Sequence, residues 1–157
     1  MTDNRDMNQV VTCVNPDLYP LTSPQREIWF DQLRHPDAVL YNIGGELRLP
    51  GAIDAARFQQ GIDLLVRKHD TLRLVLSEVT DEDGVPLQTI LAPWPVVVPV
   101  HDVSQAPDPR AAADALIQRR FEAPFTLVGS PLFRYELVRL GPDDYRWLGV
   151  YHPLILD

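Results

Sequence analysis

The side chains that could perform chemistry are few and lie far apart in the sequence. The 157-residue chain has four histidines and one cysteine, Cys13. Cys13 stands in a polar stretch without a neighbouring base, which disfavours a nucleophilic role. No two histidines have the spacing of zinc ligands, so we predict no metal site. The run Asp81-Glu82-Asp83 could bind a cation, but a solvated turn explains it better.

Other common chemical motifs are also missing from the sequence. Gly129-Ser130-Pro131 lacks the Gly-x-Ser-x-Gly turn of hydrolases, and Gly44-Gly45 lacks the lysine and glycine spacing of a phosphate-binding loop. Arg67-Lys68 could meet a phosphate, although a solvated helix end explains the pair equally well. The histidine with the most distinctive setting is His152, which closes the last predicted strand and precedes Pro153.

Helices are predicted at three places. The first begins at Thr22-Ser23-Pro24, where a hydroxyl can cap the helix and proline suits its first turn, and it ends at His35-Pro36. Asp54 caps the second, and Asp108 with Pro109 opens the third, which continues to residue 121. Apolar residues of the second helix form one stripe with a period of 3.6 residues: Phe58, Ile62, Leu65 and Val66, with His69 at its end. We expect His69 to be packed and hydrogen-bonded, and His35 and His101 to lie in loops.

Strands are predicted at residues 42–49, 72–79, 87–91, 94–100, 132–140 and 145–152. The strand at 87–91 should return antiparallel to 72–79, and the last two should form a hairpin. Pro95 and Pro99 should keep the strand at 94–100 at a sheet edge. The order of elements predicts an α/β or α+β two-layer lobe with a mixed sheet and helices packed on it.

Composition narrows the class of protein. The chain is 45% hydrophobic and 23% charged, which is typical of one globular domain, and its net charge of −8 disfavours nucleic acid as a partner. The longest uncharged apolar run, at 90–100, is too short and too rich in proline to cross a membrane. A single cysteine and the lack of a secretory signal indicate a cytoplasmic protein. We expect a flexible leader at 1–18 and a domain at 19–157.

Three segments resemble the opening half of a condensation domain of nonribosomal peptide synthetases. Leu21-Thr22-Ser23-Pro24-Gln25-Arg26-Glu27-Ile28-Trp29 is similar to the family motif Ser/Thr-x-Ala-Gln-x-Arg-x-Trp. Arg67-Lys68-His69-Asp70-Thr71-Leu72-Arg73 is similar to Arg-His-Glu-x-Leu-Arg, and Tyr151-His152-Pro153-Leu154-Ile155-Leu156-Asp157 to His-His-x-x-x-Asp-Gly. The stretch from His35-Pro36-Asp37 to Leu40-Tyr41-Asn42-Ile43-Gly44-Gly45 looks more like the starter subtype, which attaches a fatty-acyl group to an amino acid.

The resemblance implies one lobe, similar to chloramphenicol acetyltransferase, of a two-lobed enzyme that forms an amide. On this reading the chain is a truncated N-terminal lobe, and its partners are carrier proteins and the missing C-terminal lobe. No cofactor is expected to bind directly, since the family's substrates arrive as thioesters on the phosphopantetheine of carrier proteins. The missing lobe should leave apolar surface uncovered, so we expect self-association or poor solubility.

The resemblance also assigns roles to residues of the third motif. The family's catalytic base is the second histidine, and here that position is Pro153, which has no proton acceptor. His152 matches the first histidine, and strand alternation should turn it away from the side that Pro153 occupies. Asp157 matches a structural acid, which should pair with Arg73 of the second motif. We therefore expect the isolated chain to be inactive. The alternative is a degenerate lobe that only binds a carrier protein or a partner lobe.

Overall fold

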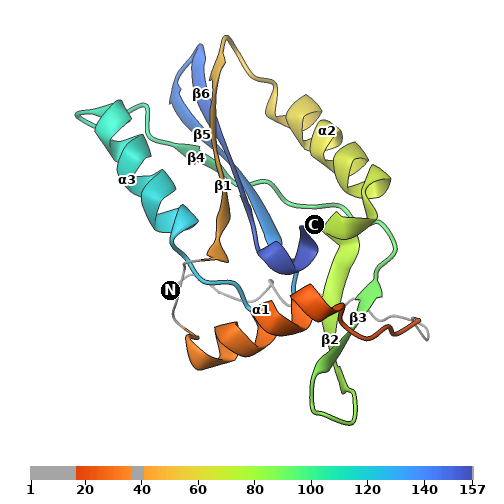
Figure 1. Cartoon of the computed structure of the whole chain (residues 1–157). Coiled ribbons are helices and arrows are strands. Elements are labelled where there is room, and N and C mark those ends of the chain that lie inside the picture. The colour runs from red at the N-terminus through yellow and green to blue at the C-terminus, as the bar shows by residue number, and fades with distance from the viewer. Residues whose placement is uncertain (1–16, 37–40, 157) are drawn as a thin grey trace, which may run out of the picture.

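The computed structural model describes residues 17–36 and 41–156 of the chain (Figure 1). Of the expected leader at 1–18, only residues 17 and 18 are described, and Asp157 lies outside the described residues. The predicted helices are confirmed as α1 (Ser23–Arg34), α2 (Ala55–Lys68) and α3 (Pro109–Phe121). Thr22 caps α1 in a capping box with Gln25, while Asp54 and Asp108 accept backbone N–H bonds at the starts of α2 and α3.

A four-stranded mixed sheet forms the centre of the described molecule. Its strand order is β1-β6-β5-β4. The strands are β1 (Ile43–Pro50), β4 (Val100–Asp102), β5 (Phe133–Gly141) and β6 (Asp144–Tyr151). β5 and β6 form the predicted hairpin, β1 pairs antiparallel with β6, and β4 runs parallel to β5. The mixed sheet with helices packed on it is thus confirmed.

A separate antiparallel pair consists of β2 (Leu74–Thr80) and β3 (Pro86–Ile90). Figure 1 shows α2 and α3 on opposite faces of the central sheet, with α1 across one end. The larger core cluster joins α1, α2 and β2 to one face of the sheet, and a small cluster of Ala113, Val138 and Leu140 joins α3 to the other. Strand alternation on β5 explains this division, because Leu137 and Val138 point to opposite faces.

Several sequence expectations need correction. Residues 94–99 form no strand, and only Val100–Asp102 does, because Pro95 and Pro99 cannot donate to a ladder; it lies at a sheet edge as expected. His101 is therefore in a strand and not in a loop. His69 is exposed and not packed, since it is the C-cap of α2 and the chain turns there into the 3-10 helix η2 (Asp70–Arg73). The predicted strand at 72–79 thus begins only at Leu74.

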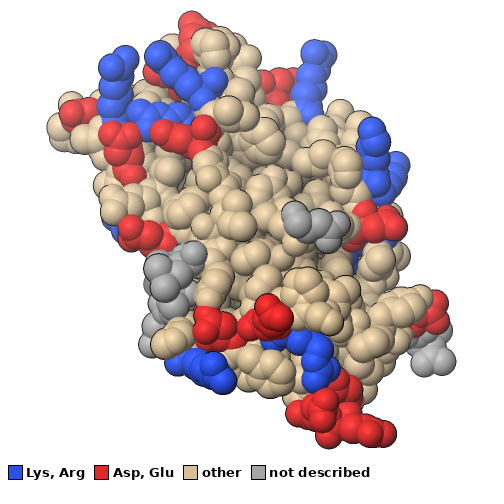
Figure 2. All heavy atoms as spheres, viewed as in Figure 1, with Lys and Arg blue, Asp and Glu red and all other residues tan. Residues whose placement is uncertain are grey.

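Figure 2 shows that charged side chains gather around the rim of one face, while its middle is largely uncharged. The exposed large apolar residues include Ile43 and Leu47 of β1 and Val97 in the segment before β4. The apolar surface expected to be left by a missing lobe stays a prediction. Within residues 17–36 and 41–156, the structure has no helix that is both long and apolar enough to span a membrane.

Candidate active site

His152 lies in the core of the molecule, at the point where β6 ends. It is 2% exposed, and its backbone N–H donates to the carbonyl oxygen of Leu132 over 2.8 Å. Its ring Nδ1 accepts from the backbone N–H of Leu154 at 3.3 Å, and its Nε2 lies 3.4 Å from Oε1 of Gln32 on α1. An accepting Nδ1 assigns the proton to Nε2, which can donate to the amide oxygen. Both ring nitrogens therefore face protein groups.

Burial also sets the protonation state of this histidine. Desolvation lowers the pKa of His152 from 6.5 to about 4, so the ring is neutral near pH 7. The ring of Phe125 lies edge-on to it, with 6.0 Å between centroids. A neutral imidazole could accept a proton, but the lone pair of Nδ1 already receives the Leu154 N–H. Within the third motif, both ring nitrogens of His152 are therefore engaged by protein groups.

Pro153 is the first residue of the 3-10 helix η3 (Pro153–Ile155) and is partly exposed. Its fixed φ suits the first turn of a helix, and its missing N–H is not needed there. The strand alternation expected beyond His152 therefore ends at this proline. Pro153 has no proton acceptor, and its correspondence to the base of the family stays a prediction.

Arg73 is the last residue of the second motif, and it is anchored by contacts with Leu91 and Asp70. Its Nη1 donates to the carbonyl oxygen of Leu91 at 2.5 Å, and its Nη2 forms an ion pair with Asp70. The buried Nε has no hydrogen-bond acceptor among the described residues. The expected Arg73–Asp157 pair lies outside them, because Asp157 is not described.

Gln25 connects the first motif to the third. Its Nε2 donates to the carbonyl oxygen of Leu154 at 2.8 Å and to Oε1 of Gln88 on β3 at 2.9 Å. Its Oε1 accepts from the backbone N–H of Thr22 at 2.9 Å and from Nε2 of Gln88 at 3.0 Å. One amide thus holds the start of α1, the strand β3 and the turn after His152 in a fixed arrangement.

Arg26, the next residue of the first motif, holds the loop between β2 and β3. It forms ion pairs with Asp81 at 2.6 Å and with Asp83 at 2.9 Å. The pKa of Asp81 lies below its ordinary value, first because its carboxylate accepts the backbone N–H of Val85 and also because Arg26 donates to it. The acidic run Asp81-Glu82-Asp83 therefore forms a turn, and Arg26 pairs with two of its carboxylates. Among the residues that the structure describes, no group of three or more His, Cys, Asp or Glu could hold a metal ion.

A second cluster of polar side chains surrounds the buried Glu136, which the sequence patterns did not indicate as a site. Glu136 on β5 is 1% exposed and pairs with Nε2 of His101 at 2.7 Å and with Nε of Arg120 at 2.5 Å. It borders a pocket of about 230 Å³ whose other lining residues include Trp94, Val97, Arg120 and Arg134. The sequence signal was weak, because the same strand also carries Arg134 and Arg139. A buried carboxylate requires partners, and here α3 and β4 supply them.

The lobe has a mixed sheet with helices on both faces, and Gln25 of the first motif contacts Leu154 of the third motif beside the end of β6. The family model of the condensation domain matches residues 15–157. The chain belongs to the condensation-domain family, as the sequence motifs indicated.

Individual relatives agree with this assignment. Isonitrile lipopeptide synthase of Streptomyces coeruleorubidus is 32% identical over 141 residues, which are 90% of this chain and 10% of that protein. Tyrocidine synthase 3 of Brevibacillus parabrevis is 33% identical over 141 residues, 90% of this chain and 2% of that protein. The chain therefore spans a tenth or less of these two relatives.

Solved structures show the same fold. The starter condensation domain of rhizomide synthetase RzmA has a TM-score of 0.80 and 33% identity, over 90% of this chain and 33% of that one. The first condensation domain of the calcium-dependent antibiotic synthetase has a TM-score of 0.74 and 26% identity, over 87% of this chain and 32% of that one. The described lobe thus corresponds to about a third of these domains, and the starter domain is among the similar ones.

Proposed function

We propose that this chain forms one wall of a condensation site that joins a carrier-bound acyl group to an amino acid. The observation that supports this most directly is the family match over residues 15–157, together with the contact between the first and third motifs at the end of β6. In the reaction, the amine nitrogen attacks the thioester carbonyl carbon. The C–N bond forms, the C–S bond breaks, the phosphopantetheine sulfur leaves with the bonding electrons, and the proton lost by the nitrogen ends on that sulfur as the thiol.

The residues of this chain would act by positioning rather than by proton transfer. Gln25 fixes the carbonyl of Leu154, and His152 fixes its N–H, so that the turn at Pro153 has a defined shape. Holding two reactants in place can contribute more to rate than a general base does, about 7–11 kcal/mol against about 3–5 kcal/mol. Pro153 supplies no base, so we infer that the isolated chain is inactive and that a second lobe completes the site.

The acyl donor that we favour is a fatty-acyl thioester on a carrier protein. Several structures of the RzmA starter domain, 33–34% identical to this chain, are described with C8-CoA, and one relative is a lipopeptide synthase. The carriers would bring both substrates on phosphopantetheine, with no cofactor held by the chain itself. The reducing compartment that a single cysteine indicates suits such carriers.

The test compares amide formation by the chain alone and by the same chain followed by a condensation-domain second lobe. Acyl and aminoacyl carrier proteins are the substrates, and product is measured by mass spectrometry. We expect no turnover by the chain alone. In the two-lobed form, Pro153→His should raise the rate by roughly 10²–10⁴, the range of general-base assistance.

Pro142→His, in the exposed turn between β5 and β6, is the matched control and should leave the rate unchanged. Turnover by the 157-residue chain alone would contradict the two-lobed site. An unchanged rate in Pro153→His would show that the missing base does not limit the reaction.

A second candidate function is a degenerate lobe that binds a carrier or a partner lobe without chemistry. The proline at the base position, beside a buried and neutral His152, favours it. Binding of a phosphopantetheine-bearing carrier, together with two-lobed forms that remain inactive even with Pro153→His, would support this alternative.

A further inference from the structure

β1 is a long strand at the free edge of the central sheet. It pairs with β6 on one side, and among the described residues no strand lies on its other side. Every residue of β1 except Leu49 is exposed, and the Leu47 side chain is 57% exposed. An exposed edge of eight residues is a template for pairing with another strand.

The backbone groups at this edge are arranged for antiparallel pairing. The N–H of Gly51 donates to the carbonyl oxygen of Asp143, on the β6 side. In an antiparallel ladder such bonds alternate, so the odd-numbered residues of β1 turn their N–H and C=O groups toward β6. Gly44, Glu46 and Arg48 therefore turn theirs to the free edge. Position 50 also faces the free edge, and because Pro50 has no backbone N–H, it presents only a carbonyl oxygen there.

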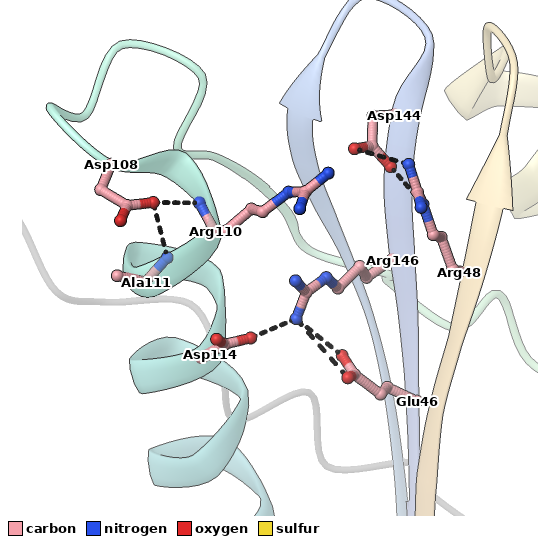
Figure 3. A network of polar contacts seen from close by, with 8 residues as sticks. All are labelled: Glu46, Arg48, Asp108, Arg110, Ala111, Asp114, Asp144 and Arg146. Atoms are coloured by element: carbon pink, nitrogen blue, oxygen red, sulfur yellow. Dashed lines mark hydrogen bonds and ion pairs between the residues drawn. The ribbon is translucent and has the colours of Figure 1, made fainter.

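The charges on β1 are arranged symmetrically about Leu47. Glu46 precedes it and Arg48 follows it, and Figure 3 shows both side chains on the strand beside β6. If two β1 strands pair antiparallel with Leu47 opposite Leu47, each Glu46 faces the Arg48 of the other copy. A shift by two residues in the partner's position places Glu46 opposite Glu46 or Arg48 opposite Arg48. Like charges directly opposite are destabilising, so the charge pattern favours the Leu47-centred register over the two registers next to it.

We propose that β1 is a self-association edge, which pairs antiparallel with β1 of a second copy of this chain, centred on Leu47. The Leu47 pair occupies a non-hydrogen-bonded position, where opposing Cα atoms come within about 4.5 Å and side chains touch. The Glu46–Arg48 pairs lie on either side of it, and their backbone groups exchange the hydrogen bonds. The two central sheets then form one continuous sheet with a twofold axis through Leu47, an isologous contact.

The side chains of Glu46 and Arg48 are already engaged within the chain. Glu46 contacts Arg146 at 3.3 Å, and Arg146 also pairs with Asp114 on α3, whereas Arg48 lies 3.1 Å from Asp144 (Figure 3). These ion pairs are at the surface, with Arg48 65% exposed, so both groups can be shared with a second copy. Contact through one strand buries less than a standard interface, and the dimer should be weak and sensitive to salt.

The experiment measures the dissociation constant of the 157-residue chain by sedimentation velocity over a concentration series. We expect a concentration-dependent dimer. Glu46→Arg and Arg48→Glu should each weaken it by about tenfold or more, because two attractive cross-strand pairs become repulsive. The double variant E46R/R48E still lacks the ion pairs with Arg146 and Asp144 within each chain, but it restores the opposite-charge pairs between copies. Its dissociation constant should therefore return to within about threefold of that of the unmodified chain.

Controls separate this contact from general charge effects. Glu27→Arg on α1 and Arg57→Glu on α2 make the same charge changes at exposed positions away from β1 and should not alter the dissociation constant. Hydrogen exchange should show the amides of Gly44, Glu46 and Arg48 protected only at concentrations at which the dimer forms. Circular dichroism confirms that each variant is folded.

Three outcomes overturn the proposal: a monomer at all concentrations, a dimer that does not respond to the single reversals, or a double variant that fails to recover while remaining folded. A β1 edge protected only when a second condensation lobe is supplied would assign that lobe as its occupant instead. None of these outcomes depends on amide formation, so they are distinct from a failure of the proposed activity.

Discussion

The ring of His152 is held on both sides by the protein, with Leu154 at one nitrogen and Gln32 at the other. The sequence showed that this residue closes a strand and precedes Pro153. It could not show that the chain turns into η3 at that point, because the alternation rule applies only while a strand continues. The burial of His152 depends on contacts with Phe125 and α1, which are remote in the sequence.

We predict that the stability of the fold depends on the protonation of His152. The pKa is about 4 in the folded chain and near 6.5 in the unfolded chain. Between these values only the unfolded state binds the proton, so the free energy of unfolding falls as the pH falls from 6.5 to 4. The full difference is about 3 kcal/mol. Urea unfolding at pH 7.0, 6.0 and 5.0 measures it.

His152→Asn is the control for this prediction, since its amide oxygen can still accept the Leu154 N–H. This variant should be less stable at pH 7 but should lose most of the pH dependence above pH 5. An equal slope in both proteins would assign the effect to another group.

At the scale of elements, adjacent glycines in β1 have different environments. A Cβ on Gly44 would lie 2.0 Å from the carbonyl oxygen of Gly149 on β6, a backbone atom that cannot move aside independently. A Cβ on Gly45 would meet nothing within 4 Å. Gly44 is therefore required for the close approach of β1 and β6, whereas Gly45 is not.

Gly44→Ala should destabilise the fold by about 1–3 kcal/mol, as overpacking against a fixed neighbour does. Gly45→Ala is its matched control and should change stability by less than about 1 kcal/mol, in the stabilising direction if at all. Thermal unfolding of the two variants provides the comparison. Similar losses in both would mean that β1 does not approach β6 as closely as described.

Patterns among neighbouring residues predicted the helices and most strands, whereas the pairing of the strands depends on contacts between distant residues. Caps at Thr22, Asp54 and Asp108 correctly placed the helices, because capping depends on neighbours a few residues away. Local patterns did not indicate that β1 would pair with β6, or that the β2–β3 hairpin would form a sheet separate from the central one. Glu136 was missed for the same reason, since its partners His101 and Arg120 come from other elements.

At the scale of the whole molecule, Gln25 joins segments that are distant in sequence. Gln25→Ala removes bonds to Leu154, Gln88 and the backbone of Thr22, and should lower the free energy of unfolding by about 1–3 kcal/mol. Gln118→Ala, which removes only an exposed contact with Glu122, should cost less than about 0.5 kcal/mol. Chemical denaturation of both variants tests this. Equal effects would mean that the link between the motifs contributes little to folding.

The pairing of β1 with β6 also affects how the chain can fold while it is being made. Glu46 and Arg146, which meet across these strands, are 100 positions apart. On a ribosome, β1 emerges long before its neighbour exists, whereas β2 and β3 can pair almost at once. The nascent chain must therefore carry an unpaired β1 while the next 100 residues are synthesised, and closure of the central sheet is expected to be a slow event.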